Sequence, residues 1–254
     1  MKELEKIPKE LEHLKLQKLY YCGNLELMSR RKITIIGSRN PNVYAQSFTK
    51  EIASRIVQCG GVVVSGGALG VDIIAHASAL PSTIMVSPSS LDIIYPKTNQ
   101  KIIQRIYQES LIFSQFPPSY FPRRYSFLER NKLVVGFGEC VIIPQADSKS
   151  GSMQSARYAL KMGKKIYVPP HRLRESEGTQ RLAKNGYAKV IWDIDSFMED
   201  FFGECLEVKA HDEILEFCQK NPFFEEAFLK FGEILFEYEL EGKIRRINGR
   251  IEVV

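Results

Sequence analysis

The stretch Pro144-Gln145-Ala146-Asp147-Ser148-Lys149-Ser150-Gly151-Ser152 joins an apolar run over 140–143 to a helical pattern over 153–162. A small, hydroxyl-rich loop between a strand and a helix leaves backbone N–H groups free, and the helix N-terminus adds a partial positive charge. We therefore expect an anion-binding site here, formed by Lys149, Ser150, Gly151 and Ser152. Lys149 adds charge to such a site, unless it pairs with Asp147.

The same arrangement occurs twice more in the chain. The apolar run 33–36 leads into Gly37-Ser38-Arg39, and the run 62–64 leads into Ser65-Gly66-Gly67. Arg39 can bind a phosphate through two parallel hydrogen bonds, or it can form a surface ion pair. The glycines can bring backbone N–H groups to a phosphate or simply permit a tight turn. One such loop suits a mononucleotide, whereas three suggest a ligand with several phosphates.

Strand-like and helix-like segments alternate along the first two hundred residues. The expected strands are 33–36, 61–65, 83–87, 111–114, 140–144, 165–168 and 189–192. The expected helices are 43–59, 70–80, 98–109, 124–135, 153–162 and 176–186. Strands that are apolar on both faces and alternate with helices predict an α/β, Rossmann-like fold: a mostly parallel sheet with helices on both faces. Ligands of such sheets bind beyond the carboxyl ends of the strands, so the three loops should share one edge.

Charge and pattern divide the chain into two expected domains. Residues 1–204 carry a net charge of +9 and residues 205–254 a net charge of −4. Residues 1–32 are helical to irregular in pattern, and we expect them to cap the sheet. A closing helix over 193–203 precedes the boundary. The first domain, 1–204, should therefore hold the sheet, and the second, 205–254, should fold separately.

The second domain has a pattern of three helices followed by a hairpin. Helices are expected over 211–220, 222–231 and 233–240, and Asn248-Gly249 is a strong two-residue turn signal between strands over 243–247 and 250–254. This is a winged-helix-like arrangement. The third helix carries Glu233, Glu237, Glu239 and Glu241, which a phosphate backbone would repel. We therefore predict that this domain contacts protein rather than reading a DNA groove.

Positive charge is concentrated near the 144–152 loop. The whole chain has 35 Lys and Arg, 30 Asp and Glu, and a net charge of +5, whereas residues 123–189 alone hold 14 basic and 5 acidic residues. Clustered basicity indicates a polyanion partner. The alternative is a solvated basic face without a partner.

Other classes of protein are disfavoured by composition. No run approaches the roughly 20 apolar residues of a membrane span, and the charged N-terminus lacks a secretory apolar region, so we expect a cytoplasmic protein without membrane contact. Four scattered histidines and five cysteines without C-x-x-C spacing predict no metal site and reduced thiols. We expect no cofactor.

A further set of cations and one ring lies around the expected helix 124–135. Arg123, Arg124 and Phe127 combine charge for a phosphate backbone with a ring on which a base can stack, although Phe127 could instead be core. Arg130, Asn131 and Lys132 follow, and could line the same groove or form internal pairs. Asp72 and His76 lie four apart on an expected helix, where we expect them to order the fold rather than act as an acid–base pair.

These motifs together resemble the DNA-processing protein A family (DprA, also called Smf). The resemblance spans residues 33–192, and the tail is similar to the family's winged-helix-like domain. The matching segments, as they stand in this sequence, are Gly37-Ser38-Arg39 with Tyr44; 64–72 with Ala75-His76; Leu91-Asp92-Ile93-Ile94-Tyr95-Pro96 with Asn99; Ser126 to Lys132; and Ser150-Gly151-Ser152 with Gly163-Lys164 and Val168-Pro169. The chain departs from the family pattern at Leu69, Gln145 and His171.

The resemblance implies an extended Rossmann-like domain that dimerises and binds single-stranded DNA. It implies a non-enzymatic role, in which incoming DNA is protected and the RecA recombinase is loaded during natural transformation. An alternative is a nucleotide phosphoribohydrolase-like enzyme on a similar fold, but the P-G-G-x-G-T-x-x-E loop of those enzymes is absent from 144–152. A dinucleotide-dependent oxidoreductase is a third possibility, and no G-x-G-x-x-G fingerprint follows the first expected strand.

Overall fold

A computed structural model describes residues 1–203, 213–240 and 242–253, which form two compact units, Met1–Leu206 and Glu207–Val254. The boundary expected at 204/205 lies among residues outside the described ranges. Each unit is treated by itself below.

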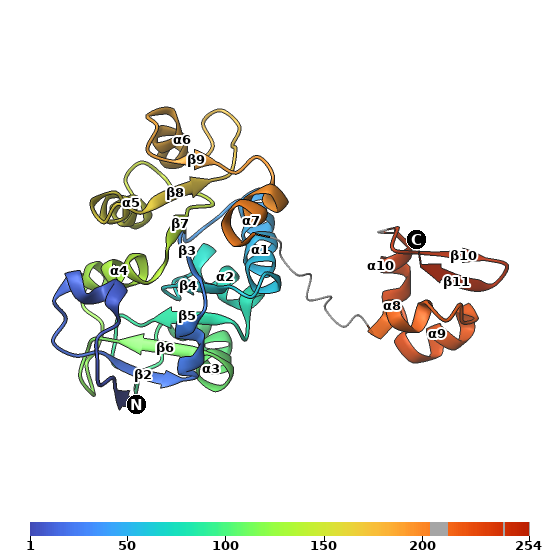
Figure 1. Cartoon of the computed structure of the whole chain (residues 1–254), viewed down its shortest axis with the longest axis horizontal. Coiled ribbons are helices and arrows are strands. Elements are labelled where there is room, and N and C mark those ends of the chain that lie inside the picture. Colours follow the sequence, from blue (N-terminus) through green and yellow to red (C-terminus); the bar gives the residue numbers. More distant parts are fainter. Residues whose placement is uncertain (204–212, 241, 254) are drawn as a thin grey trace. The chain divides into compact units, whose positions relative to one another are not determined.

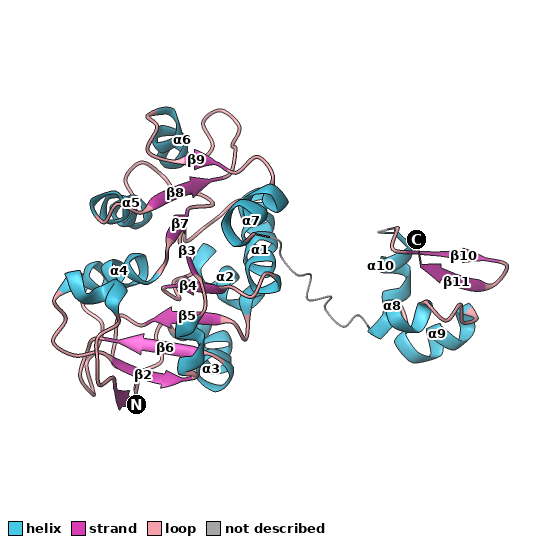
Figure 2. Ribbon diagram, in the orientation of Figure 1, coloured by secondary structure: helices cyan, strands magenta, loops and turns pink. Residues whose placement is uncertain are grey.

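The first unit is built on one nine-stranded sheet with the order β1-β2-β6-β5-β4-β3-β7-β8-β9 (Figure 2). Seven strands run parallel: β3 (Lys32–Ile35), β4 (Val62–Ser65), β5 (Thr83–Val86), β6 (Leu111–Ser114), β7 (Cys140–Ile142), β8 (Lys165–Val168) and β9 (Lys189–Val190). Each of these seven lies within, or within one residue of, an expected strand. The predicted α/β fold with a mostly parallel sheet is confirmed.

Helices cover both faces of the sheet, because the central strands are apolar on both sides (Figure 1). One face holds α1 (Val43–Gln58), α2 (Val71–Ala79), α3 (Gln100–Glu109) and α7 (Ile194–Phe202). The other holds α4 (Arg124–Phe137), α5 (Gly151–Lys161) and α6 (Glu177–Lys184). The core is divided accordingly: Val64, Phe113 and Val141 pack on the α4 side, and Ile35, Val63 and Ile142 on the α1 side.

The N-terminal segment differs from the expected cap. Its strands β1 (Lys2–Glu3) and β2 (Tyr20–Gly23) extend the sheet itself, since β2 pairs antiparallel with β6 and β1 with β2. The intervening 3-10 helix η1 (Lys9–Leu14) contacts α4, and its Leu11 is fully buried. The first thirty residues therefore belong to the sheet and its core, and they form an antiparallel edge rather than the helical-to-irregular cap expected.

The order of the central strands places a switch point between β3 and β7. The chain proceeds from β3 to β4 and β5 on one side, then returns to place β7 on the other side of β3. Neighbouring connections diverge at such a point, which opens a crevice at the carboxyl ends of the strands. The loops after β3, β4 and β7 all end at this crevice.

The second unit contains three helices and a hairpin, as expected. The helices are α8 (Glu213–Cys218), α9 (Phe224–Phe231) and α10 (Ile234–Leu240), and the hairpin pairs β10 (Ile244–Ile247) with β11 (Arg250–Val253). Asn248 and Gly249 both have positive φ, which a tight two-residue hairpin turn requires. Leu235, Ile244 and Ile251 form part of a small core. Glu241 of the expected acidic helix lies outside the described residues.

Candidate nucleic-acid interface

The three small-residue loops meet at the carboxyl edge of the sheet, as the sequence predicts. They line a cavity of 360 Å³ together with residues of α2 and α4. Side chains and backbone tie the loops to one another: Ser152 Oγ donates to Gly37 O at 2.7 Å, and the Ser38 N–H donates to Gln145 O at 2.8 Å. The Val71 N–H donates to Ser38 O at 3.1 Å. The cavity is therefore formed by loops that hold one another in place.

The loop after β7 presents the N-terminus of α5 to this cavity. Ser150 is the N-cap residue, and its side chain accepts a hydrogen bond from the Met153 N–H at 3.3 Å. The N–H groups of the first helical turn lack partners within the helix, so those of Gly151 and Ser152 are available to an anion. No atom lies within 4 Å of where a Cβ on Gly151 would be, so the approach to this N-terminus is open.

A buried ion pair lines the cavity. Arg130 Nη1 lies 3.7 Å from Asp72 Oδ2, and the two residues are 5 % and 6 % exposed. Burial raises the pKa of the Asp72 carboxyl, while the Arg130 guanidinium and the Ala68 N–H oppose that rise. A Cβ at Gly66 would overlap Arg130 Nη1, so a larger residue there would displace this guanidinium from its place beside Asp72. Arg130 thus forms the internal pair that was one of its two expected alternatives.

His76 also serves the fold. The Thr83 hydroxyl donates to Val63 O at 2.9 Å, and it lies 2.7 Å from His76 Nδ1, from which it accepts a hydrogen bond. Burial, reinforced by the Arg130 charge, lowers the pKa of His76 to about 3. The ring is therefore neutral at physiological pH. Asp72 and His76 each have an internal partner, which agrees with the structural role expected for them.

A second, smaller cavity of 100 Å³ continues from the first and shares Arg39, Ala68 and Arg130 with it. Phe127 is half-buried in its wall and contacts Tyr95 edge-on, with ring centroids 5.8 Å apart. Phe127 is thus a wall residue rather than a core residue. The two adjoining cavities are called the carboxyl-edge groove below.

The groove gathers most of the residues that the sequence predicts for DNA binding. Its lining includes Gly37, Ser38, Arg39, Gly66, Phe127, Arg130, Asn131, Ser150, Gly151 and Ser152. Lys149 is exposed on the adjoining loop, with no ion pair to Asp147 or to any other described residue. Arg123 and Arg124 are exposed at the start of α4, where the Arg123 guanidinium lies 6.0 Å from the Tyr120 ring centroid. Exposed cations thus lie close in sequence to residues that line the groove.

Three of the predicted residues make contacts within the fold. Ser65 is fully buried and its hydroxyl donates to Ile35 O at 2.6 Å. Gly67 is buried with a φ of +74°, and a Cβ there would overlap Met85, so this glycine serves the turn. Lys132 Nζ pairs with Glu129 at 2.7 Å. The ion pair of Lys132 is one of the two alternatives expected for it, and phosphate binding by backbone groups of Ser65 and Gly67 stays a prediction.

Three residues of the groove region, Tyr95, Pro96 and Asn99, have no individual role predicted from the sequence. Tyr95 and Pro96 line the smaller cavity, and the Asn99 side-chain amide donates to Gly67 O at 3.1 Å, which fixes the loop after β4. All three belong to the segment Leu91 to Asn99, which the family resemblance already singled out. The sequence does not show that this segment reaches the groove, because that depends on the strand order: the segment follows β5, which lies next to β4 in the sheet.

The described residues include three free cysteines. Cys22, Cys140 and Cys218 are free thiols, whereas Cys59 is disulfide-bonded, which departs from the expectation of reduced thiols. Among residues 1–203, 213–240 and 242–253, no cluster of three or more His, Cys, Asp or Glu is placed to hold a metal ion. In the same residues no helix has the length and apolar character needed to cross a membrane.

The fold and the groove define a class: an α/β protein with an extended Rossmann-like sheet and an anion-suited groove at its switch point. Comparison with known proteins then identifies the particular family within this class. The family model described as DNA recombination-mediator protein A matches residues 2–202. The chain belongs to this family, and the match covers the whole sheet.

Individual relatives agree with this assignment. The chain is 32 % identical over 188 residues to the DNA processing protein DprA of Bacillus subtilis and 34 % identical over 182 residues to the protein Smf of Synechocystis. These alignments cover 72 % and 68 % of this chain, and 63 % and 46 % of the two relatives. The chain thus spans about half to two thirds of the length of the curated relatives it matches.

Solved structures show the same similarity. The DNA processing protein A of Helicobacter pylori, a structure described for its unique single-stranded DNA binding mode, has a TM-score of 0.78 and 48 % identity, over 80 % of this chain and 96 % of that one. DprA of Streptococcus pneumoniae has a TM-score of 0.72 and 28 % identity, over 77 % and 71 % of the two chains. The extended Rossmann-like fold is thus shared with proteins of this family.

Proposed function

We propose that this chain binds single-stranded DNA in the carboxyl-edge groove and acts as a non-enzymatic mediator of recombination. The observation that carries the proposal is the meeting of three anion-suited loops around Arg39, with Phe127 in the adjoining wall. Loops and exposed cations suit successive phosphates, and a half-buried ring suits an unstacked base. Membership of the family and similarity to a structure described for single-stranded DNA binding support the choice of ligand.

The proposal extends to the biological role. We propose that the protein protects incoming DNA and helps load RecA onto it in natural transformation, in the cytoplasm, and its family membership supports this role. We propose that the first unit, called the sheet unit below, forms a homodimer and that the acidic second unit, called the tail unit below, contacts protein rather than DNA. Light scattering of the purified chain tests the dimer. Assembly of RecA filaments on an oligonucleotide, with and without this protein, tests the loading.

The central experiment is a titration with labelled 20-nucleotide single strands and duplexes of the same sequence at several salt concentrations, followed by fluorescence anisotropy. We expect tighter binding of the single strand. The logarithm of the binding constant should fall with the logarithm of salt concentration by about 0.7 for each phosphate contact. A preference for duplex would contradict the proposal.

The second candidate function is a nucleotide phosphoribohydrolase on a similar fold. Its only support is the architecture, because the loop 144–152 lacks the glycine pair and the glutamate of those enzymes. Two of the four charged side chains that line the groove, Asp72 and Arg130, are engaged with each other. Incubation with AMP distinguishes the two candidates: the DNA-binding proposal expects no release of free adenine, and release of adenine would revive the enzyme.

A further inference from the structure

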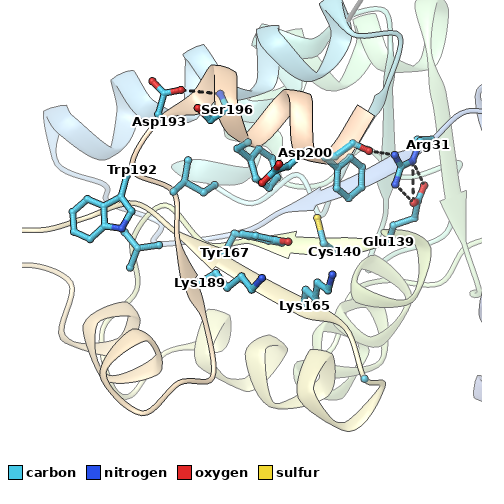
Figure 3. Close-up of a pocket in the computed structure, with 15 residues that line it drawn as sticks. Arg31, Glu139, Cys140, Lys165, Tyr167, Lys189, Trp192, Asp193, Ser196 and Asp200 are labelled. Atoms are coloured by element: carbon cyan, nitrogen blue, oxygen red, sulfur yellow. Dashed lines mark hydrogen bonds and ion pairs between the residues drawn. The ribbon is translucent and has the colours of Figure 1, made fainter. Parts of the chain in front are cut away.

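A separate cavity of 620 Å³ lies between α7 and the sheet edge formed by β8 and β9 (Figure 3). It has no lining residue in common with the carboxyl-edge groove. Lys165, Tyr167 and Lys189 line its sheet side, and α7 closes the other side. Trp192 stands at one end of the view in Figure 3 and Arg31 at the other. This space is called the α7 slot below.

The strand register explains why the sheet side of the slot is basic. Tyr167 pairs with Lys189 across β8 and β9, and Lys165 precedes Tyr167 by two residues. Because alternate residues of a strand share a face, the three side chains project to the face that α7 covers. Phe197 of α7 contacts the Tyr167 ring with centroids 4.8 Å apart, whereas both lysines remain exposed. Figure 3 shows the two ammonium groups on the same side of Tyr167.

Most other charges of the slot already have partners. Arg31 pairs with Glu139 at 2.7 Å. Asp193 is the N-cap of α7 and accepts a hydrogen bond from the Ser196 N–H at 2.7 Å, which lowers the pKa of that carboxyl. Asp200 is the remaining carboxylate of the lining.

Lys165 and Lys189, by contrast, form no ion pair with any described residue. The lining as a whole is formally balanced, with Arg31, Lys165 and Lys189 against Glu139, Asp193 and Asp200. The two ammonium groups on its sheet side have no ion-pair partner among the described residues and are therefore available to the phosphates of an anionic ligand.

Trp192 adds a stacking surface to this charge. It is the single tryptophan of the chain and is 80 % exposed, directly after the edge strand β9. An exposed indole beside unpaired lysines is the combination with which proteins bind single strands, since the ring stacks on a base and the cations neutralise the backbone. The volume of the slot is within the range of small-molecule sites, so it can hold one nucleotide unit.

We propose that the α7 slot is a second contact for single-stranded DNA, in which Trp192 stacks on an unpaired base and Lys165 and Lys189 bind the adjoining phosphates. The inference shares its class of ligand with the proposed function and rests on it in that respect. It adds a second site, outside the carboxyl-edge groove, so that one sheet unit holds a strand at two separate points.

The single tryptophan makes the test local. Oligothymidylate of 20 nucleotides is added to the full chain while tryptophan emission and the anisotropy of a label on the DNA are recorded together. Stacking on the indole should quench the emission in a saturable way. The quenching should persist in Arg39→Ala, because that substitution acts on the groove and not on the slot.

Charge reversal at the slot supplies the matched comparison. In Lys165→Glu/Lys189→Glu the midpoint of quenching should move to at least tenfold higher DNA concentration, because two phosphate contacts become repulsive. The control Lys161→Glu/Lys184→Glu changes the net charge equally at exposed lysines of α5 and α6 outside the slot, and should move the midpoint less than threefold. Far-UV circular dichroism melting checks that both variants are folded.

Two outcomes would overturn the inference while leaving the proposed function intact. One is unchanged emission while anisotropy reports binding, which would leave the slot to a protein partner or to solvent. The other is an equal shift in the slot variant and its control. Loss of both signals in the wild-type chain would instead contradict the proposed function itself.

Discussion

The two units differ in how their arginines are paired. In the sheet unit, Arg39 and Arg124 lie exposed and form no ion pair with any described residue. In the tail unit, Arg245 pairs with Glu252 at 2.9 Å, and Arg246 pairs with Glu239 at 2.6 Å. The guanidinium of Arg246 also lies 4.0 Å from the Phe224 ring centroid. Both units therefore carry arginines, but only the sheet unit leaves several of them without a carboxylate. Counting basic residues does not reveal this difference, because it depends on which cations already have partners.

Arg130 represents a third situation, a cation of the sheet unit that is paired and buried. Asp72→Ala would leave this guanidinium without a counter-charge in the interior, and we expect it to lower the free energy of unfolding by about 3–5 kcal/mol. Urea denaturation followed by circular dichroism measures the change. If the variant is as stable as the wild type, Arg130 is not held by this ion pair and counts, like Arg39, as an unpaired cation.

Acid should weaken the sheet unit through His76. Its pKa is about 3 in the folded chain and about 6.5 when unfolded, so the unfolded state binds a proton first as the pH falls. Stability from this group is fully present above about pH 6.5 and is lost progressively down to about pH 3, by about 2 kcal/mol at pH 5.

Comparing urea denaturation at pH 7.5 and pH 5 in the wild type and in His76→Asn isolates this effect. The variant should lose less stability between the two pH values, because an amide does not titrate. Equal losses would show that His76 is not responsible, and that acid acts on other groups of the unit.

Arg39→Ala tests the unpaired cations. We expect binding of single-stranded DNA to weaken about tenfold, and the salt dependence to become shallower by about 0.7, because one phosphate contact is lost. The thermal melting temperature should stay unchanged, since no described residue forms an ion pair with Arg39. Anisotropy titrations at several salt concentrations measure both quantities, and an unchanged affinity would remove Arg39 from the interface.

The smallest effect is expected for Arg246→Ala in the tail unit. Exposed ion pairs contribute less than about 1 kcal/mol, so the unit should be only slightly destabilised, and DNA binding should not change. Arg246→Lys keeps the charge and serves as the control. If Arg246→Ala binds DNA more weakly and Arg246→Lys does not, the hairpin of the tail unit contacts DNA, and the proposed difference between the two units is wrong.

Much of the fold could be predicted from the sequence because its signals are local. Apolar runs such as Val62-Val63-Val64, separated by helical patterns, predict the parallel strands, and the general rule for parallel sheets then brings the three loops to one edge. Strand β2 could not be found in this way. It is half-exposed and gains its place only by pairing with β6, about ninety residues further along the chain.

The state of single side chains in the site was less predictable. Ser65 and Arg130 belong to motifs that suit an anion site, yet the first hydrogen-bonds to Ile35 O and the second pairs with Asp72. Both partners come from other elements, so their distance is set by packing and not by spacing in the sequence. Arg39 follows its strand directly, and its exposure agrees with the local prediction.

The contact between η1 and α4 gives the N-terminal residues an influence on the groove. Leu11 packs so closely against Gly136 that a Cβ there would lie 2.6 Å from Leu11 Cδ2, and the same helix carries Phe127 and Arg130 into the groove. The N-terminal segment thus packs against and supports the helix that presents these residues. We expect removal of residues 1–14 to loosen that helix and to lower DNA affinity, although none of the proposed DNA contacts is removed.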